Sequence, residues 1–272
     1  MVSAKDIIVK PITAQAANAL VKRVHYSGKV VPNSTLHFGA YLNDKLEGVM
    51  SFGSPMDKSK VLPLVSGTVW TGMLELNRMA FSDRLPRNSE SRCMAVAFRL
   101  IKKHYPHIEW ILSFSDGTQC GDGTIYRASG FVLTQIKPNS SLYETPCGVP
   151  IARMTWDSAT PQARIALAKK YGFTQYDAAS FLTKTAKLNN MKPLIGYQLR
   201  YIYFLNESTK ARLTVPIIPF SKIDEMGAGM YKGESIKRDT KATTNDQLVG
   251  GGAIPTITLH SSCAASKKTH EA

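Results

Sequence analysis

The sequence has no apolar run close to the roughly 20 residues that a helix needs to cross a bilayer. Its first residues, Met1 to Asp6, also lack the apolar centre of a secretion signal. The pattern therefore gives no indication of a membrane, and we expect the chain to stay in the cytoplasm.

Cysteine is scarce as well. The 272 residues include four, namely Cys93, Cys120, Cys147 and Cys263. No two of them form a C-x-x-C pair, which argues against a zinc knuckle or ribbon. In a reducing compartment they are expected to be free thiols, with a disulfide as the less favoured alternative.

Acidic residues are few relative to basic ones. The chain has 34 lysines and arginines but only 20 aspartates and glutamates, which gives a formal net charge of +14. An excess of this size favours a polyanionic partner. Nucleic acid is the commonest such partner, and an anionic cofactor such as coenzyme A would also benefit. Simple solubility is the alternative.

The end of the chain differs in composition from the rest. Residues 234–272 contain Gly250-Gly251-Gly252 and almost no aromatic side chains, which predicts a flexible tail. Five basic and four acidic residues nearly cancel there. The positive excess therefore belongs to residues 1–233, which we expect to form a single catalytic domain.

Strands and helices are predicted to alternate along this domain. The expected strands cover residues 7–11, 35–42, 46–52, 72–81, 109–114, 131–136 and 197–205. The expected helices cover residues 14–25, capped by Thr13, then 94–101, 123–129, 161–171 and 177–187. Residues 54–71 are expected to form an irregular loop. The order predicts an α/β (α+β) fold with a mixed central sheet flanked by helices.

A polar turn precedes the helix predicted over residues 94–101, and Asn88 or Ser89 is its expected cap. A helix N-terminus presents unpaired N–H groups and a partial positive charge, so it favours phosphate. Arg84, Arg87 and Arg92 could pair with the phosphate oxygens. The alternative is an ordinary capped helix with solvated arginines.

Two other places carry reactive side chains. Asp116 follows a strand at its carboxyl end, where α/β sheets collect ligands, and Tyr126 lies in the next helix. His25 and Tyr26 end the first helix in a loop that is expected to face a site. Each residue alone also fits a turn, core packing or a helix cap. Together they would suit iron, or acid–base catalysis on an amine.

These features, in this order, resemble the Mom DNA-modification proteins of bacteriophages, which are themselves similar to GNAT acyltransferases. The resemblance covers residues 20–135 well and residues 195–220 loosely. It is carried by His25-Tyr26-Ser27-Gly28, Leu74 to Met79, Asn88 to Ser91, Phe114 to Gly117, and Thr124 to Phe131.

The resemblance implies a GNAT-like fold and a function. The chain would convert adenine in phage DNA to N6-(carbamoylmethyl)adenine, also called acetamido-adenine, inside the infected bacterial cell, and so protect the DNA from host restriction. The implied catalytic residues are His25, Tyr26, Asp116 and Tyr126. Tyr26, Asp116 and Tyr126 would hold iron. The expected partners are double-stranded DNA and a second copy of the chain, with no membrane.

An acetyl-CoA or related acyl donor is also implied, with Arg87, Asn88, Ser89, Ser91 and Arg92 at its phosphates. Lys29, Arg78 and Arg84 are expected to contact DNA. The turn departs from the GNAT pattern, however, because residues 87–92 include no glycine and side chains hinder close approach of phosphates to the backbone. The alternative function is a conventional GNAT N-acetyltransferase that acts on a protein or a small-molecule amine. A DNA-binding protein without catalysis is another.

Chemistry on the adenine amine is expected to need base flipping, because the base is stacked inside the duplex. Four aromatic side chains are candidates to stack on the flipped base. They are Tyr26, Phe38, Tyr41 and Phe114. Core packing is the alternative for each.

Overall fold

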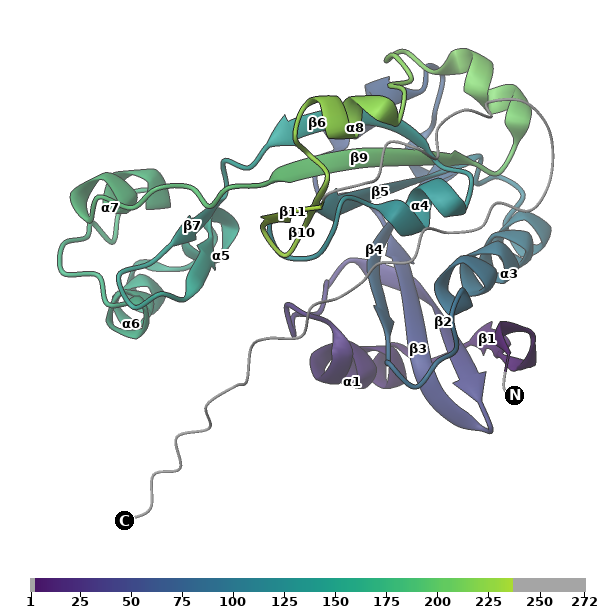
Figure 1. Ribbon diagram of the computed structural model, residues 1–272, viewed down its shortest axis with the longest axis horizontal. Coiled ribbons are helices and arrows are strands. Elements are labelled where there is room, and N and C mark those ends of the chain that lie inside the picture. Colours follow the sequence, from purple (N-terminus) through teal and green to yellow (C-terminus); the bar gives the residue numbers. More distant parts are fainter. Residues whose placement is uncertain (1–2, 237–272) are drawn as a thin grey trace. The chain divides into compact units, whose positions relative to one another are not determined.

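The computed structural model describes residues 3–236 (Figure 1). Most of the flexible tail predicted over residues 234–272 lies outside the described residues, namely residues 237–272. Its first two residues, Glu234 and Ser235, form a short strand. Within the described range, no helix is both long and apolar enough to cross a membrane. The three cysteines in this range are free thiols, as predicted, and Cys263 lies outside it.

The strands are β1 Ile8–Pro11, β2 Ser34–Leu42, β3 Lys45–Gly53, β4 Met73–Phe81, β5 Trp110–Asp116, β6 Val132–Pro138, β7 Leu142–Glu144, β8 Pro150–Ala152, β9 Tyr197–Phe204, β10 Met230–Tyr231 and β11 Glu234–Ser235. The α-helices are α1 Ala14–Val24, α2 Lys58–Val61, α3 Ser89–His104, α4 Thr124–Ala128, α5 Arg153–Asp157, α6 Pro161–Tyr171, α7 Leu182–Leu188 and α8 Ser221–Glu225. The 3-10 helices are η1 Ala4–Asp6, η2 Leu62–Leu64, η3 Trp70–Gly72 and η4 Glu207–Arg212.

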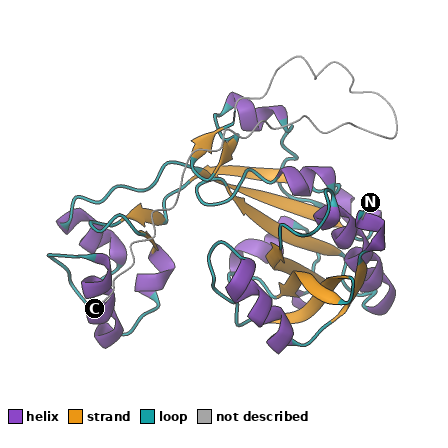
Figure 2. Cartoon of the chain, turned by 60° about the horizontal axis from the view of Figure 1, so that its bottom comes forward, coloured by secondary structure: helices purple, strands orange, loops and turns teal. Residues whose placement is uncertain are grey.

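A seven-stranded sheet in the order β1-β2-β3-β4-β5-β9-β6 forms the centre of the fold (Figure 2). Its neighbouring strands are antiparallel except for β4 and β5, which are parallel. These two strands pair only over residues 73–75 and 110–112. Further along, β4 still pairs with β3 and β5 with β9, so the sheet opens between them. The predicted mixed sheet flanked by helices is confirmed.

Helices pack on both faces of the sheet. On one face, α3 buries Met94, Ala97 and Phe98 in the largest apolar cluster of the described residues, together with Phe38 and Phe52 from β2 and β3. On the other face, α1 packs Ala17, Leu20 and Val21 against Val49 and Ala80. The 3.6-residue spacing of these apolar side chains gives each helix its buried stripe.

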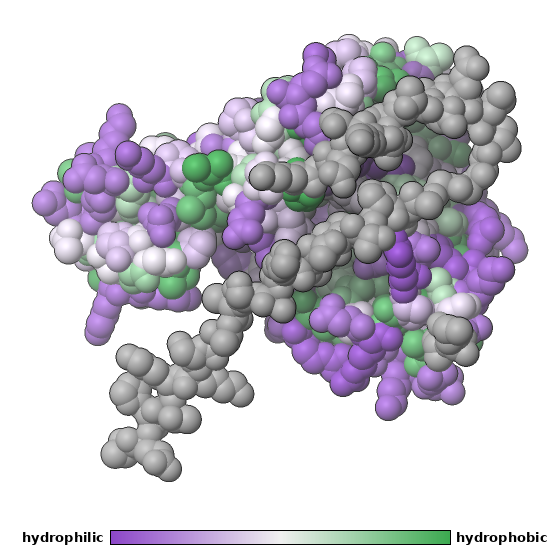
Figure 3. Space-filling model, in the orientation of Figure 1, coloured by the Kyte–Doolittle hydropathy of each residue, from purple (hydrophilic) through white to green (hydrophobic). Residues whose placement is uncertain are grey.

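Residues 139–196 connect β6 to β9 in the sequence, and these two strands are neighbours in the sheet. We call this connection the β6–β9 module; it includes β7, β8 and α5 to α7. The module has its own core, built around the fully buried Trp156. Buried Arg164 donates hydrogen bonds to the carbonyls of Trp156, Asp157, Ala178 and Ser180. Figure 3 shows mostly hydrophilic side chains, in purple, on its outer end.

Three local predictions need correction. The helix predicted over 177–187 begins only at Leu182, because the Asp177 carboxylate instead binds the Ala179 N–H and the Ser180 hydroxyl. Residues 54–71 are not irregular throughout, since α2, η2 and η3 form there. Asn88 is the N-cap of α3 by position, but its φ of 67° lies in the left-handed region and its side chain makes no capping hydrogen bond.

Candidate active site

The opening between β4 and β5 brings together side chains from separate parts of the sequence. Asp116 ends β5, and Tyr126 lies on α4. Glu75 and Arg78 lie on β4, the strand on the other side of the opening. Tyr26 comes from the loop after α1 and interacts electrostatically with Asp116, Tyr126 and Arg78. Three of the predicted catalytic residues therefore lie in one place.

The Asp116 turn (residues 116–120) is organised by its own carboxylate. Oδ1 accepts a hydrogen bond from the Thr118 N–H at 2.9 Å and Oδ2 accepts one from the Gln119 amide at 3.1 Å. An aspartate that binds the N–H two residues ahead stabilises a turn. Asp116 is nevertheless only partly buried, so lone pairs on its carboxylate are left for a ligand.

Two neighbouring segments hold the Asp116 turn in place. The Gly117 N–H donates to the Tyr197 carbonyl at 2.8 Å. From the β10–β11 hairpin, the Lys232 and Gly233 N–H groups donate to the Cys120 and Gly117 carbonyls, both at 2.9 Å. A Cβ on Gly196 would lie 2.0 Å from Thr118 Oγ1, so only glycine fits beside the turn.

Tyr126 forms the floor of the opening and is 8% exposed. Its ring packs on Phe131 and Tyr201, with centroids 5.1 and 5.3 Å away. Burial raises the pKa of Tyr126 to about 12, although a hydrogen bond with Ser113 opposes the shift. The phenol is therefore protonated at neutral pH and can donate a hydrogen bond.

The rim loop (residues 25–29) lies on the other side of the opening and carries the remaining predicted catalytic residues. His25 Nδ1 lies 2.9 Å from Ser27 Oγ. Burial, and to a smaller extent Arg78, lowers the pKa of His25 to about 4, so its imidazole is neutral at pH 7. The Tyr26 ring lies 4.3 Å from that of His25.

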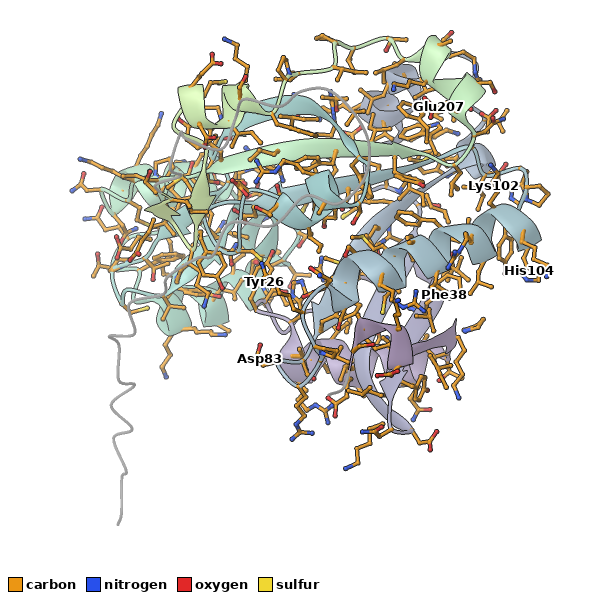
Figure 4. All side chains as sticks on the ribbon, turned by 45° about the vertical axis from the view of Figure 1, so that its right-hand side comes forward. Tyr26, Phe38, Asp83, Lys102, His104 and Glu207 are labelled. Atoms are coloured by element: carbon orange, nitrogen blue, oxygen red, sulfur yellow. The ribbon has the colours of Figure 1, made fainter. Side chains whose placement is uncertain are left out.

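Tyr26 is 53% exposed, which makes it the accessible aromatic side chain of the site (Figure 4). Partial burial, followed by the nearby Asp116, raises the pKa of Tyr26 to about 12. The rings of Tyr26 and Tyr126 thus both present neutral phenols, one at the rim of the opening and one at its floor.

Glu75 is a residue that the sequence reasoning missed as a site residue. It is the last residue of β4 that pairs with β5, so its side chain lies where the strands separate. Burial raises the pKa of Glu75 to about 7, and Arg78 opposes the shift. A carboxyl group with this pKa exchanges a proton near neutral pH. The sequence signal was its place in the Leu74 to Met79 segment.

The structure lends no support to the expected iron site at Tyr26, Asp116 and Tyr126. Within residues 3–236, no group of three or more His, Cys, Asp and Glu side chains is arranged to hold a metal ion. Asp116 is the one carboxylate of the expected set, and it keeps lone pairs beside the two hydrogen bonds that it accepts.

A cavity of about 540 Å³ lies where α3, α4 and η1 meet. Its lining includes Asn88, Ser91 and Arg92 from the expected cofactor set, together with Lys5 and Arg99. Arg92 also donates from Nε to the Ala4 carbonyl at 2.9 Å.

The other two members of the expected cofactor set lie differently. Ser89 is buried and donates its hydroxyl to the Pro86 carbonyl, so it does not face a ligand. Arg87 is exposed. The cavity is therefore lined by only three of the five residues that were predicted to bind the phosphates of the donor.

The three side chains expected at DNA make contacts within the protein. Arg78 donates to the Lys29 carbonyl at 2.8 Å and so ties β4 to the rim loop. Lys29 Nζ donates to Thr155 Oγ1 of the β6–β9 module at 3.1 Å. Arg84 pairs with Glu47 at 3.2 Å, and its side chain remains 76% exposed.

Of the four aromatic candidates for stacking on a base, the prediction for Phe38 is wrong. It is 2% exposed and packs edge-on against Phe52 in the core, away from Tyr26 (Figure 4). Phe114 packs against a buried apolar cluster, and the Tyr41 ring lies under Lys10 Nζ at 4.3 Å. Tyr26 remains the best placed of the four.

Comparisons with known proteins show that the sequence is similar to one protein family and that the fold is weakly similar to solved structures. The methylcarbamoylase Mom of Escherichia phage Mu is 38% identical over 128 residues, which are 47% of this chain and 53% of that protein. The alignment therefore spans about half of the relative's length.

Among solved structures, an IAA acetyltransferase from Bacillus cereus has 10% identity and a TM-score of 0.40, covering 73% of this chain and 99% of its own. A GNAT acetyltransferase from Elizabethkingia anophelis, with acetyl-CoA bound, has 15% identity and a TM-score of 0.35, covering 49% of this chain and 81% of its own. GNAT acetyltransferases are thus among the structural neighbours, at similarities too low to carry function. The model of the Mom protein family matches residues 6–222, and the chain belongs to that family.

Proposed function

We propose that the chain modifies the exocyclic amine of adenine in DNA with an acetamido (carbamoylmethyl) group. The observation that carries the proposal is the gathering of Tyr26, Glu75, Asp116 and Tyr126 at the opening of the sheet in a member of the Mom family. The similarity to a methylcarbamoylase supports this group over an acetyl group.

The transfer replaces one hydrogen of the adenine amine, so a base must take up a proton. Glu75 is our candidate, because a base with a pKa of about 7 is matched to neutral pH. Asp116 would accept a hydrogen bond from the same amine and orient it. The phenols of Tyr26 and Tyr126 would donate hydrogen bonds to negative charge that develops on the donor. His25 would stay neutral and support Tyr26.

The cavity beside α3 is our candidate for the donor. Lys5, Arg92 and Arg99 give it a cationic lining, and the N-terminus of α3 adds a partial positive charge. These features suit the phosphates of a coenzyme A derivative or a related anionic donor. To give the carbamoylmethyl product, the donor must release its leaving group from the methylene carbon that bonds to the amine, because transfer of an acyl group would give an amide instead. The opening of the sheet would then receive the reactive end.

Double-stranded DNA is the proposed substrate. The excess of basic residues favours a polyanion, and a flipped adenine could stack on the exposed ring of Tyr26. The exposed Arg84 side chain could contact the phosphate backbone. Modification in the infected host cell would then shield phage DNA from restriction.

Expression of the chain in a bacterium, followed by mass spectrometry of digested DNA, tests the function. We expect an adenosine heavier by one acetamido group, and we expect the Asp116→Asn variant to lose it while remaining folded by circular dichroism. Unmodified adenosine with the wild-type chain contradicts the proposal. Calorimetric titration separates the alternative, because a conventional acetyltransferase binds acetyl-CoA without binding duplex DNA.

A further inference from the structure

One exposed apolar residue lies on the segment that packs against the Asp116 turn. Ile195 precedes Gly196, whose backbone packs against Thr118 of that turn. The next residue, Tyr197, accepts the hydrogen bond from the Gly117 N–H. Ile195 is therefore placed at the edge of the candidate active site, although it lies about 80 residues from Asp116 in sequence.

Ile195 is 79% exposed, the largest value among the exposed large hydrophobic side chains of residues 3–236. Single exposed apolar residues are common and need no explanation by themselves. Here, however, Ile195 lies in the short segment where the β6–β9 module rejoins the sheet, next to groups that would handle a base.

The backbone on both sides of Ile195 is fixed. The Leu194 N–H donates to the Leu142 carbonyl at 2.9 Å. The Leu194 carbonyl accepts the Asn139 side-chain amide at 2.8 Å, and the Gly196 carbonyl accepts the Asn139 N–H at 2.8 Å. The isoleucine is therefore held outward on a rigid support, and ordering it on binding would cost little entropy.

Exposed lysines occur on three segments of this region, namely the stretch before Ile195, the β10–β11 hairpin and the rim loop. Lys192 lies three residues earlier and is exposed. Lys232 is exposed on the hairpin that binds the Asp116 turn, and Lys29 is exposed on the rim loop. Among residues 3–236, none of these three lysines has a carboxylate within ion-pair distance. An apolar projection among unpaired cations fits a duplex, which offers phosphates around a stack of bases.

We propose that Ile195 inserts into the base stack of duplex DNA at the position that the target adenine leaves. This inference rests on the proposed function and adds how the duplex is opened. Proteins that distort DNA commonly insert an apolar side chain between bases, and removal of a base from the stack must be compensated. Lys29, Lys192 and Lys232 would hold the flanking phosphates.

A duplex with 2-aminopurine in place of adenine tests the proposal without turnover, because this base becomes fluorescent when it leaves the stack. We expect the wild-type chain to raise the fluorescence and Ile195→Ala to reduce that rise about tenfold. Ile8→Ala is the matched control, because Ile8 is 60% exposed on the edge strand β1. It should behave as wild type.

Any of three results overturns the proposal that Ile195 inserts into the base stack. They are no fluorescence rise with the wild-type chain, an equal rise with Ile195→Ala, and Ile195-dependent binding to vesicles of anionic lipid with no effect on DNA. The cellular mass-spectrometry assay then keeps the two proposals apart. A wild-type level of modification by Ile195→Ala removes the role of Ile195 and leaves the proposed function. Unmodified DNA with the wild-type chain contradicts the proposed function, and the fluorescence of the 2-aminopurine duplex then decides separately whether Ile195 opens the base stack.

Discussion

The two sides of the site differ in how firmly they are held. The Asp116 turn is bound by its own carboxylate, by the start of β9 and by the β10–β11 hairpin. The rim loop also has internal hydrogen bonds between His25 and Ser27, but it is tied to other segments by the Arg78 and Lys29 contacts, and its Tyr26 is half exposed. Under the proposed function, the first side would be preorganised to orient the reacting amine and the second would be open to admit the substrate.

The largest expected effect is on the preorganised side. Gly196→Ala would place its Cβ 2.0 Å from Thr118 Oγ1 and 2.8 Å from Thr118 Cα, with φ at +152°. We expect about 3 kcal/mol of destabilisation, measured by urea unfolding. The control is Gly148→Ala, which also has positive φ (+76°) but no atom within 4 Å, so it should cost only about 1 kcal/mol. Equal losses would show that the close packing is unimportant.

Glu75→Gln should lower the rate of adenine modification by about 100-fold, the usual contribution of a general base. The wild-type rate should rise with pH through about 7, where Glu75 loses its proton. Retention of this pH profile by the Gln variant would remove Glu75 from the chemistry.

The raised pKa of Glu75 also predicts how the stability of the protein depends on pH. Burial raises the pKa of Glu75 to about 7 from its ordinary value of 4.5, so the folded state binds the proton more tightly than the unfolded state does. Its stabilising contribution is complete below pH 4.5 and is lost as pH rises through about 7. We expect the wild type to lose at most about 1.4 kcal/mol per pH unit relative to Glu75→Gln, as measured by denaturation at several pH values. Parallel curves would contradict this.

Loss of the buried phenol should have a smaller effect. Tyr126→Phe keeps the ring packing on Phe131 and Tyr201 but removes the hydroxyl that bonds Ser113. We expect about a tenfold lower rate of modification and a loss of about 1 kcal/mol in stability. An unchanged rate would mean that the hydroxyl has only a structural role.

The smallest effect on the rate of modification is expected on the open side. Tyr26→Phe keeps the exposed ring for stacking and should lower the rate only a few-fold, whereas Tyr26→Ala should weaken duplex binding by about 1–3 kcal/mol. Fluorescence anisotropy with a labelled duplex measures the second effect. Equal binding by the Ala and Phe variants would exclude stacking on Tyr26.

The sequence predicted the sheet well for a physical reason. Alternation and turn residues act locally, so β2, β3 and the Thr13 cap of α1 could be placed from the chain alone. The β6–β9 module could not, because its core depends on one buried tryptophan and on Arg164 donating to carbonyls from separate loops. Glu75 was missed because its environment follows from the short pairing of β4 with β5, which is a non-local property.

The position of β9 has a mechanical consequence. This strand is where the β6–β9 module ends, and it also pairs with β5 up to the partners Asp116 and Gln198. Only Gly196 separates Ile195 from the first residue of β9. If the proposed function holds, a force that a bound duplex exerts on the module would reach Asp116 along this one strand, so that binding of the substrate and orientation of its amine would be coupled.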